Sequence, residues 1–284
     1  MSGVVAVMRS SHPGPTLTVT VLAVVLGLAV GLDGSRLIVV AIAVLAGQLA
    51  IGWSNDLIDA DRDRRVGRRD KPIAQGAVRV PVVRALVVIA GVVGVILPFT
   101  LSLAAGLAHL ALVASGLAYN VGLKSTPASV VPFVVAFGAL PAVVTLSTAP
   151  PSGPAPWAIG VGAVFGIAIH FTNVLPDLAD DARTGVVGLP HRLGRARAGL
   201  VAFAALAAGA LLSLAGQTLW RGESTPGASA VLAVAGASVV VGIAVVGAVA
   251  VLRGGSTRLL FRLIMLAALL LVAQLAVGGA ALTV

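Results

Sequence analysis

Residues 51–76 read IGWSNDLIDADRDRRVGRRDKPIAQG and hold five of the ten acidic residues of a chain that is otherwise largely apolar. They contain the spacing Asn55-x-x-x-Asp59-x-x-x-Asp63. Steps of four keep side chains on one face of an α-helix. The spacing therefore predicts that these three side chains converge at one point of the molecule.

Two further carboxylates of the stretch divide between the faces of that helix. At about 100° per residue, Asp56 falls close to the face of Asp63, and Asp61 falls on the opposite side. Like charges at such spacing repel each other and weaken a helix. A divalent cation bound between the carboxylates is the simplest way to offset that repulsion.

The same pattern occurs a second time, as Asn173-x-x-x-Asp177-x-x-x-Asp181, with Asp180 close to the same helical face. Each copy follows a long apolar run and leads into a basic segment. Two copies predict two half-sites that face each other.

Composition places the chain in a membrane. Of its 284 residues, 58% are hydrophobic and 10% are charged, and the mean hydropathy is +1.08. Soluble domains carry about 25% charged residues, so the sequence predicts an all-α integral membrane protein. The absence of cysteine excludes disulfides and thiolate chemistry. The net charge of +9 does not indicate a nucleic-acid partner, because the positions of the basic residues are explained by the membrane topology described below.

A transmembrane helix needs about 20 apolar residues, and nine stretches qualify as candidates. We split one long uncharged stretch at Pro98, because proline interrupts a helix. We expect one domain over residues 1–284, a nine-helix bundle with pseudo-repeated halves around a central cavity. The nine candidates are 16–32, 37–54, 82–99, 101–118, 128–148, 156–174, 198–217, 229–252 and 259–283.

The basic residues follow this predicted topology. With nine spans, seventeen of the nineteen Lys and Arg residues fall on one side, and only Arg36 and Arg221 fall on the other. Cytoplasmic loops carry such an excess of Lys and Arg. The count therefore predicts a cytoplasmic N-terminus, an outer C-terminus and two acidic motifs at the cytoplasmic mouth of the bundle.

The ligand chemistry of the two motifs indicates magnesium and a phosphate. Oxygen-only ligands favour Mg²⁺ or Ca²⁺, and Mg²⁺ commonly takes one or two carboxylates together with waters and substrate phosphates. Two carboxylate pairs can hold a diphosphate between them, with neighbouring Arg and Lys meeting its remaining charge. An apolar bundle below accepts a lipid tail. This combination suits ionisation of an allylic diphosphate and alkylation of an electron-rich acceptor, with water excluded.

Several segments resemble the UbiA superfamily of intramembrane aromatic prenyltransferases, of the 4-hydroxybenzoate polyprenyltransferase type. The first motif is similar to the family's NDxxDxxxD, and the second to its DxxxD. KPIAQG, residues 71–76, resembles the family segment RPLxSG, with Lys for Arg and Gln for Ser. Further matches are Tyr119 with Lys124, Gly185, and Leu193 with Gly194.

The resemblance implies an isoprenyl diphosphate donor, a lipophilic and aromatic-type acceptor, and Mg²⁺ as cofactor. It implies a catalytic group made of Asn55, Asp59, Asp63, Asp177 and Asp181. The implied metal ligands are Asp56, Asp59, Asp63, Asp177 and Asp181. The implied substrate-binding residues are Asn173, Lys71, Tyr119, Lys124, Arg68 and Arg183. The acceptor and the length of the prenyl tail stay open.

Other interpretations of these residues compete with this one. The chain can be a cation-coupled transporter with the aspartates as ion sites, or a CDP-alcohol phosphotransferase, although it lacks that motif's Asp-Gly and Ala-Arg elements. Lys124 can be a topology residue and Tyr119 an interfacial residue. Of the histidines, we expect His109 and His170 to be packed within helices, and His12 and His191 to lie at the surface.

Overall fold

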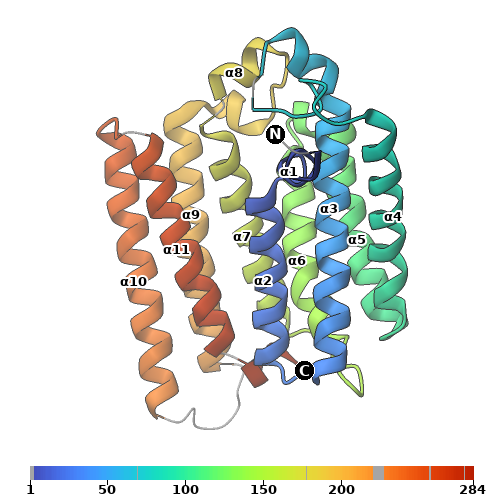
Figure 1. Cartoon of the computed structure of the whole chain (residues 1–284). Coiled ribbons are helices and arrows are strands. Elements are labelled where there is room, and N and C mark those ends of the chain that lie inside the picture. Colours follow the sequence, from blue (N-terminus) through green and yellow to red (C-terminus); the bar gives the residue numbers. More distant parts are fainter. Residues whose placement is uncertain (1–2, 69, 177, 220–226, 256, 278) are drawn as a thin grey trace.

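The computed structural model describes residues 3–68, 70–176, 178–219, 227–255, 257–277 and 279–284. Within these ranges the chain is helical, and the only β-type contact is an isolated bridge between Pro154 and Thr283. The helices run roughly parallel to one another, with α3 central to one side and α9 to α11 on the other (Figure 1). The helices are α1 (Gly3–Arg9), α2 (Pro13–Ala29), α3 (Gly34–Arg65), α4 (Val80–Phe99), α5 (Leu103–Val121), α6 (Val131–Thr145), α7 (Pro156–Val174), α8 (Leu178–Arg183), α9 (Leu189–Leu219), α10 (Gly227–Leu252) and α11 (Thr257–Val277), with 3-10 turns at Leu123–Ser125 and Gly279–Leu282.

The break predicted at Pro98 is confirmed. Helix α4 ends at Phe99 and α5 begins at Leu103. The Ser102 side chain accepts a hydrogen bond from the backbone N–H of Ala105 at 2.9 Å, which is the usual N-cap interaction for the unpaired first turn of a helix. One uncharged stretch of sequence thus forms an antiparallel helix pair.

The predicted count of nine spans is not confirmed. Each candidate stretch overlaps a helix, but by length and composition six helices of the described chain suffice to cross a membrane. A seventh is added if α1 and α2, which are bent by 65° relative to each other, count as one span. The helix Val131–Thr145 and the segment Arg262–Ala276 of α11 are apolar but shorter. The pseudo-repeat of the two halves stays a prediction.

Small residues let the helices approach closely. A Cβ atom on Gly94 of α4 would lie 2.9 Å from the backbone nitrogen of Gly47 in α3. A Cβ atom on Gly162 of α7 would lie 2.2 Å from the carbonyl oxygen of Phe137 in α6. Close backbone contact through small residues is the usual way in which membrane helices associate, so the glycines hold the bundle together.

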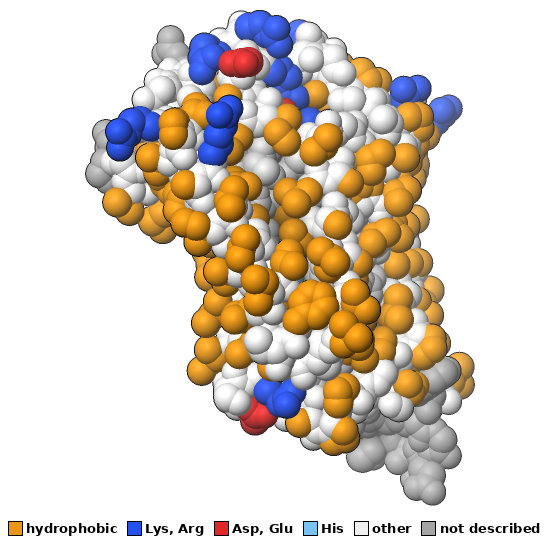
Figure 2. Space-filling model, turned by 90° about the vertical axis from the view of Figure 1, so that its right-hand side faces the viewer, with side chains coloured by type: hydrophobic (Ala, Val, Ile, Leu, Met, Phe, Trp, Pro, Cys, Tyr) orange, Lys and Arg blue, Asp and Glu red, His pale blue; other side chains and the backbone are white. Residues whose placement is uncertain are grey.

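The surface confirms an integral membrane protein. Hydrophobic side chains cover the middle of the molecule, and Lys and Arg gather at one end (Figure 2). Large apolar residues such as Val88 and Leu103 are 64% and 69% exposed. A soluble protein does not present so continuous an apolar surface to water, so this band faces lipid.

Candidate active site

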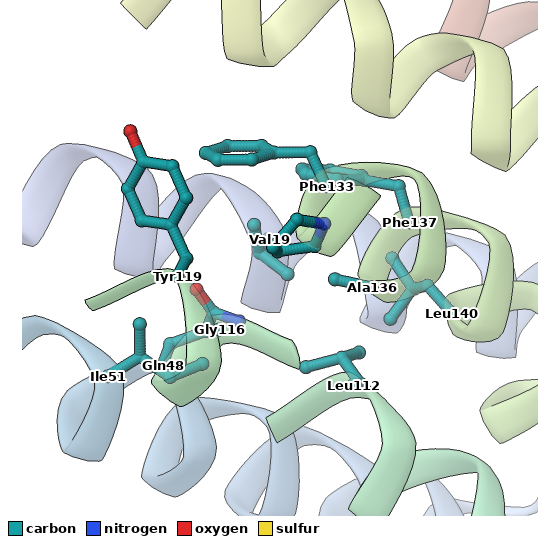
Figure 3. Close-up of a pocket in the computed structure, with 11 residues that line it drawn as sticks. Val19, Gln48, Ile51, Leu112, Gly116, Tyr119, Phe133, Ala136, Phe137 and Leu140 are labelled. Carbon is teal, nitrogen blue, oxygen red and sulfur yellow. The ribbon is translucent and has the colours of Figure 1, made fainter. Parts of the chain in front are cut away.

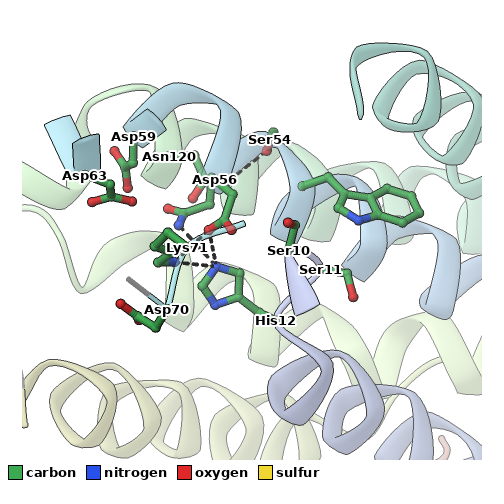
Figure 4. Close-up of polar contacts among 12 residues, drawn as sticks. Ser10, Ser11, His12, Ser54, Asp56, Asp59, Asp63, Asp70, Lys71 and Asn120 are labelled. Carbon is green, nitrogen blue, oxygen red and sulfur yellow. Dashed lines mark hydrogen bonds and ion pairs between the residues drawn. The ribbon is translucent and has the colours of Figure 1, made fainter. Parts of the chain in front are cut away.

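The first acidic motif lies on the end of α3, which continues to Arg65 beyond the predicted span. Asp56, Asp59 and Asp63 are 2%, 6% and 2% exposed, whereas Asp61 is exposed. Asn55, the first residue of the predicted spacing, is half-buried. The burial therefore agrees with the predicted division of the helix, which put Asp59, Asp63 and Asp56 toward one face and Asp61 on the opposite side. The buried face points toward the site, where Asp56, Asp59 and Asp63 lie near Lys71 (Figure 4).

Basic side chains neutralise this face. Lys124 Nζ donates to Asp59 Oδ1 at 2.5 Å. The guanidinium of Arg62 lies between two carboxylates, with its Nη2 atom 3.1 Å from Asp59 Oδ2 and 3.6 Å from Asp63 Oδ1. Buried carboxylates need such partners, because an unpaired charge away from water is costly.

The other lysine pairs with the remaining buried carboxylate. Lys71 Nζ donates to Asp56 Oδ1 at 2.6 Å, and His12 Nε2 lies 2.8 Å from the same oxygen. The His12 side chain is 37% exposed, so it lies at the surface as expected, but its contact with a buried carboxylate of the site was not predicted. Its spacing in the sequence gave no signal, because the contact joins residues 44 positions apart.

Arg68 is held beside the motif by Asp70. Its Nε and Nη2 atoms donate to the two carboxylate oxygens of Asp70 at 2.9 and 2.8 Å. These hydrogen bonds lower the pKa of Asp70 to about 2, so the pair stays ionised at neutral pH. The predicted substrate role of Arg68 stays a prediction.

The second motif has a different local structure. Helix α7 ends at Val174, and α8 begins at Leu178. Pro176 lies between them, and it lacks the N–H and clashes with the carbonyl that would continue α7. The expectation that Asn173 and Asp181 share one face of one helix is therefore wrong.

The members of the second motif lie at different depths. Asn173 is exposed at the end of α7, and Arg183 is exposed at the end of α8. The Asp181 side chain is 22% exposed, and His191 Nε2 lies 3.7 Å from its Oδ2 atom. The His191 side chain is only 5% exposed, so its predicted surface position is wrong. Asp177, a predicted metal ligand, lies outside the described residues.

The turn after Asp181 closes on a glycine. The backbone N–H of Val186 donates to the Asp181 carbonyl at 3.0 Å, and the N–H of Gly185 donates to the Ala182 carbonyl at 3.3 Å. Gly185 adopts φ +82°. This pair of bonds around a left-handed glycine is the Schellman motif that ends many helices, and it turns the chain back toward the bundle.

The loop around Lys124 brings the two motifs together. A Cβ atom on Gly188 would lie 2.6 Å from the Lys124 carbonyl oxygen, so the segment after the second motif packs directly on this loop. Leu189 N also donates to the Ser129 hydroxyl at 2.8 Å. Because Lys124 itself reaches Asp59, one loop contacts both halves of the site.

An apolar cavity of about 100 Å³ lies below the first motif, and Tyr119 is one of its lining residues (Figure 3). The Tyr119 ring packs edge-on against Phe133 and His170, with ring centroids 5.1 and 5.8 Å away. His170, predicted to be packed in a helix, is 1% exposed. The lining residues are Val19, Gln48, Ile51, Leu112, Gly116, Tyr119, Pro132, Phe133, Ala136, Phe137 and Leu140.

The oxygen ligands suit a divalent cation of the magnesium type. Arg62 already places a cationic group between Asp59 and Asp63, so these carboxylates converge closely enough to share a positive charge. No three His, Asp or Glu side chains of the described ranges form a complete metal site. Mg²⁺ does not require one, because it commonly binds one or two carboxylates and completes its shell with waters and phosphates.

Comparison with known proteins supports the fold and identifies the family. Three solved structures share the fold over nearly their whole length. Digeranylgeranylglyceryl phosphate synthase has a TM-score of 0.71 at 13% identity, over 99% of each chain, and a UbiA homologue from Archaeoglobus fulgidus bound to GPP and Mg²⁺ has a TM-score of 0.71 at 14% identity, over 98% of this chain and 100% of that one. An apo UbiA homologue from Aeropyrum pernix K1 has a TM-score of 0.70 at 19% identity, over 92% of this chain and 97% of that one. No curated protein sequence matches the chain. The model of the UbiA prenyltransferase family matches residues 16–250. This chain is therefore a member of the UbiA prenyltransferase family.

Proposed function

We propose that this prenyltransferase binds an allylic isoprenyl diphosphate at the two acidic motifs and transfers the prenyl group to a lipophilic, aromatic-type acceptor within the membrane. The observation that carries the proposal is the position of the two lysines. Lys71 and Lys124, the only lysines of the chain, both lie on carboxylates of the first motif. The apolar cavity is lined by Ile51, which precedes the first motif on α3, and by Tyr119, which precedes Lys124 at the end of α5.

The basic residues bind the diphosphate end of the donor. Lys71 and Lys124 have side chains 15% and 10% exposed, so their ammonium groups are shielded from water but accessible to a ligand at the mouth. Ammonium groups contact phosphate as point charges. As the carbon–oxygen bond of the donor breaks, both groups stabilise the negative charge that develops on the leaving diphosphate.

Of the predicted metal ligands, Asp59, Asp63 and Asp181 are the described residues that would hold Mg²⁺, because Asp56 is already paired with Lys71 and His12. The guanidinium of Arg62 lies between Asp59 and Asp63, so this position stabilises a positive charge, which supports the assignment. A homologue from Archaeoglobus fulgidus contains Mg²⁺ together with GPP. When bound, the metal would neutralise diphosphate charge and so improve the leaving group.

The cavity receives the prenyl tail. Its lining follows α5 from Leu112 to Tyr119, about 10 Å at 1.5 Å per residue. An extended chain advances about 1.2 Å per bond, so this depth accommodates about two isoprene units. Tyr119 and Phe133, whose ring centroids are 5.1 Å apart, present aromatic faces that stabilise an allylic cation.

Family membership favours this enzyme over the alternatives of a transporter or a CDP-alcohol phosphotransferase. The acceptor is then held beside the aromatic rings of Tyr119, Phe133 and Phe137. Exclusion of water by the surrounding apolar side chains protects the allylic cation from hydrolysis, and the acceptor releases a proton after it is alkylated.

We also propose that the acidic mouth faces the cytoplasm, because most Lys and Arg residues lie at that end. The cysteine-free sequence makes the orientation testable. Ala77→Cys lies at the mouth and Ser35→Cys at the opposite end, and both positions are exposed. In intact cells, an impermeant maleimide should label Ser35→Cys alone. Labelling of Ala77→Cys instead would reverse the proposed orientation.

The function is tested by diphosphate release from purified protein in detergent, with and without Mg²⁺. Geranyl, farnesyl and geranylgeranyl diphosphate are offered with a pool of phenolic acceptors, and products are identified by mass spectrometry. Mg²⁺-dependent release with a prenylated product is the expected result and identifies the acceptor. Folded protein that releases no diphosphate from any donor would contradict the proposal.

A further inference from the structure

The N-terminal residues 3–12 form a strap across the end of α3. Helix α1 is bent by 65° from α2, and Trp53 Nε1 donates to the carbonyl of Val7 at 2.9 Å. A Cβ atom on Gly52 would lie 2.3 Å from the Ser11 carbonyl oxygen. Only glycine permits so close an approach of the strap to α3.

The turn of the strap is fixed by its own hydrogen bonds. Ser10 and Ser11 are buried, and their hydroxyls donate to the carbonyls of Ala6 and Met8 at 3.0 and 2.7 Å. Thr16 donates to the Ser11 carbonyl at 2.8 Å. These bonds hold the next residue, His12, in the left-handed conformation at φ 54° and ψ 63°, which is uncommon outside glycine. Backbone strain of this kind persists only where the surroundings enforce it.

The strained backbone aims the His12 ring at the first motif (Figure 4). Its Nε2 atom lies 2.8 Å from Asp56 Oδ1, 3.2 Å from Lys71 Nζ and 3.4 Å from Asn55 Nδ2. One ring nitrogen either donates to the carboxylate or accepts from the ammonium group. In both cases the imidazole, the Asp56 carboxylate and the Lys71 ammonium group contact one another.

We propose that His12 is a positioning residue of the active site, which together with Asp56 fixes the Lys71 ammonium group for the donor diphosphate. This inference rests on the proposed function. The family match begins at residue 16, so the strap lies outside the segment that defines the family. The Asp56 carboxylate, 2% exposed, then anchors a lysine as well as belonging to the predicted metal set.

Amine labelling tests the contact without any need for turnover. Because Lys71 and Lys124 are the only lysines, a lysine-selective reagent followed by peptide mass spectrometry reports both, with Lys124 as internal reference. His12→Gly suits the positive φ and removes only the imidazole. The ratio of Lys71 to Lys124 labelling should rise about fivefold, because the Lys71 side chain is only 15% exposed and the variant removes the imidazole that covers it. Thr18→Ala, on the exposed side of α2, should leave the ratio unchanged.

An unchanged ratio in both His12→Gly and His12→Ala would overturn the contact. Using two variants guards against one that fails to fold, and thermal unfolding in detergent identifies such a variant.

Kinetics then test the positioning role. His12→Gly should raise the KM for the donor about tenfold, with a smaller change in kcat, and free imidazole should restore part of the loss. In the Lys71→Ala background, the same change should add little, because the two residues act as one unit. Fully additive losses, or a fall in kcat alone, would overturn the role. If wild-type protein turns over no donor, the proposed function fails, and the labelling ratio still decides the contact.

Discussion

The two acidic motifs have nearly the same sequence and different structures. The first lies on the unbroken helix α3, with three buried carboxylates paired to Lys71, Lys124 and Arg62. The second is divided between α7 and α8, and its Asp181 is more exposed. The difference indicates that the first half of the site is built on one continuous helix, whereas the second is carried by the short helix α8 and the segment after it, which packs against the Lys124 loop.

The largest effect is expected from removing one carboxylate of each motif. Asp59→Asn and Asp181→Asn should each lower kcat/KM about 10³-fold, because charge stabilisation of the leaving diphosphate is lost. The two should differ in stability. Asp59→Asn leaves Lys124 and Arg62 without their carboxylate, which typically costs about 3 kcal/mol for a buried pair, whereas Asp181→Asn should unfold near the wild-type temperature.

Turnover by coupled diphosphate release and thermal unfolding in detergent measure both effects. Asp61→Asn is the matched control, because this side chain is exposed on the opposite face of α3 and forms an ion pair with exposed Arg64. Retained activity in both Asp59→Asn and Asp181→Asn would refute the proposed roles of the motifs.

A second test concerns the residue that joins the motifs. Lys124→Ala should raise the KM for the donor about thirtyfold while the dependence on Mg²⁺ concentration is unchanged, because it removes one charged contact to phosphate. Lys124→Arg should recover part of this loss. Should donor affinity be unaltered in Lys124→Ala, the lysine serves membrane topology instead.

The cavity gives a further test of the comparison between the two motifs. Its lining comes from α2, α3, α5 and α6, and no described residue of the second motif contributes to it. Ala136→Phe should fill it and lower kcat/KM for geranyl diphosphate about twentyfold, with less effect on dimethylallyl diphosphate. Val135→Phe, on the exposed face of α6, is the control. Equal losses with both donors would show that the tail lies elsewhere.

The smallest effect is expected at the break between α7 and α8. Pro176→Ala removes the obstacle to a continuous helix and should shift Asp181 away from its position beside His191. We expect the donor KM to rise about threefold with stability unchanged, measured by the same kinetics and by circular dichroism. Wild-type kinetics with increased helicity would mean that the break is not needed for donor binding.

The sequence by itself determined the class of fold and the chemistry. Long apolar runs can only be helices that satisfy their own backbone hydrogen bonds in lipid. Spacings of three, four and seven within one such helix dictate which carboxylates share a face, as Asp56, Asp59 and Asp63 do. The break at Pro98 followed from the same local rules.

Tertiary structure decided which partners meet at the site. Lys71 and Lys124 reach carboxylates 15 and 65 positions away, and His12 reaches one 44 positions away, contacts that no local periodicity encodes. Pro176 was visible in the sequence, but its effect on Asp181 depends on where the following turn docks. Such docking is set by close packing of small residues such as Gly52 and Gly188, whose role appears only once the neighbouring backbone is in place.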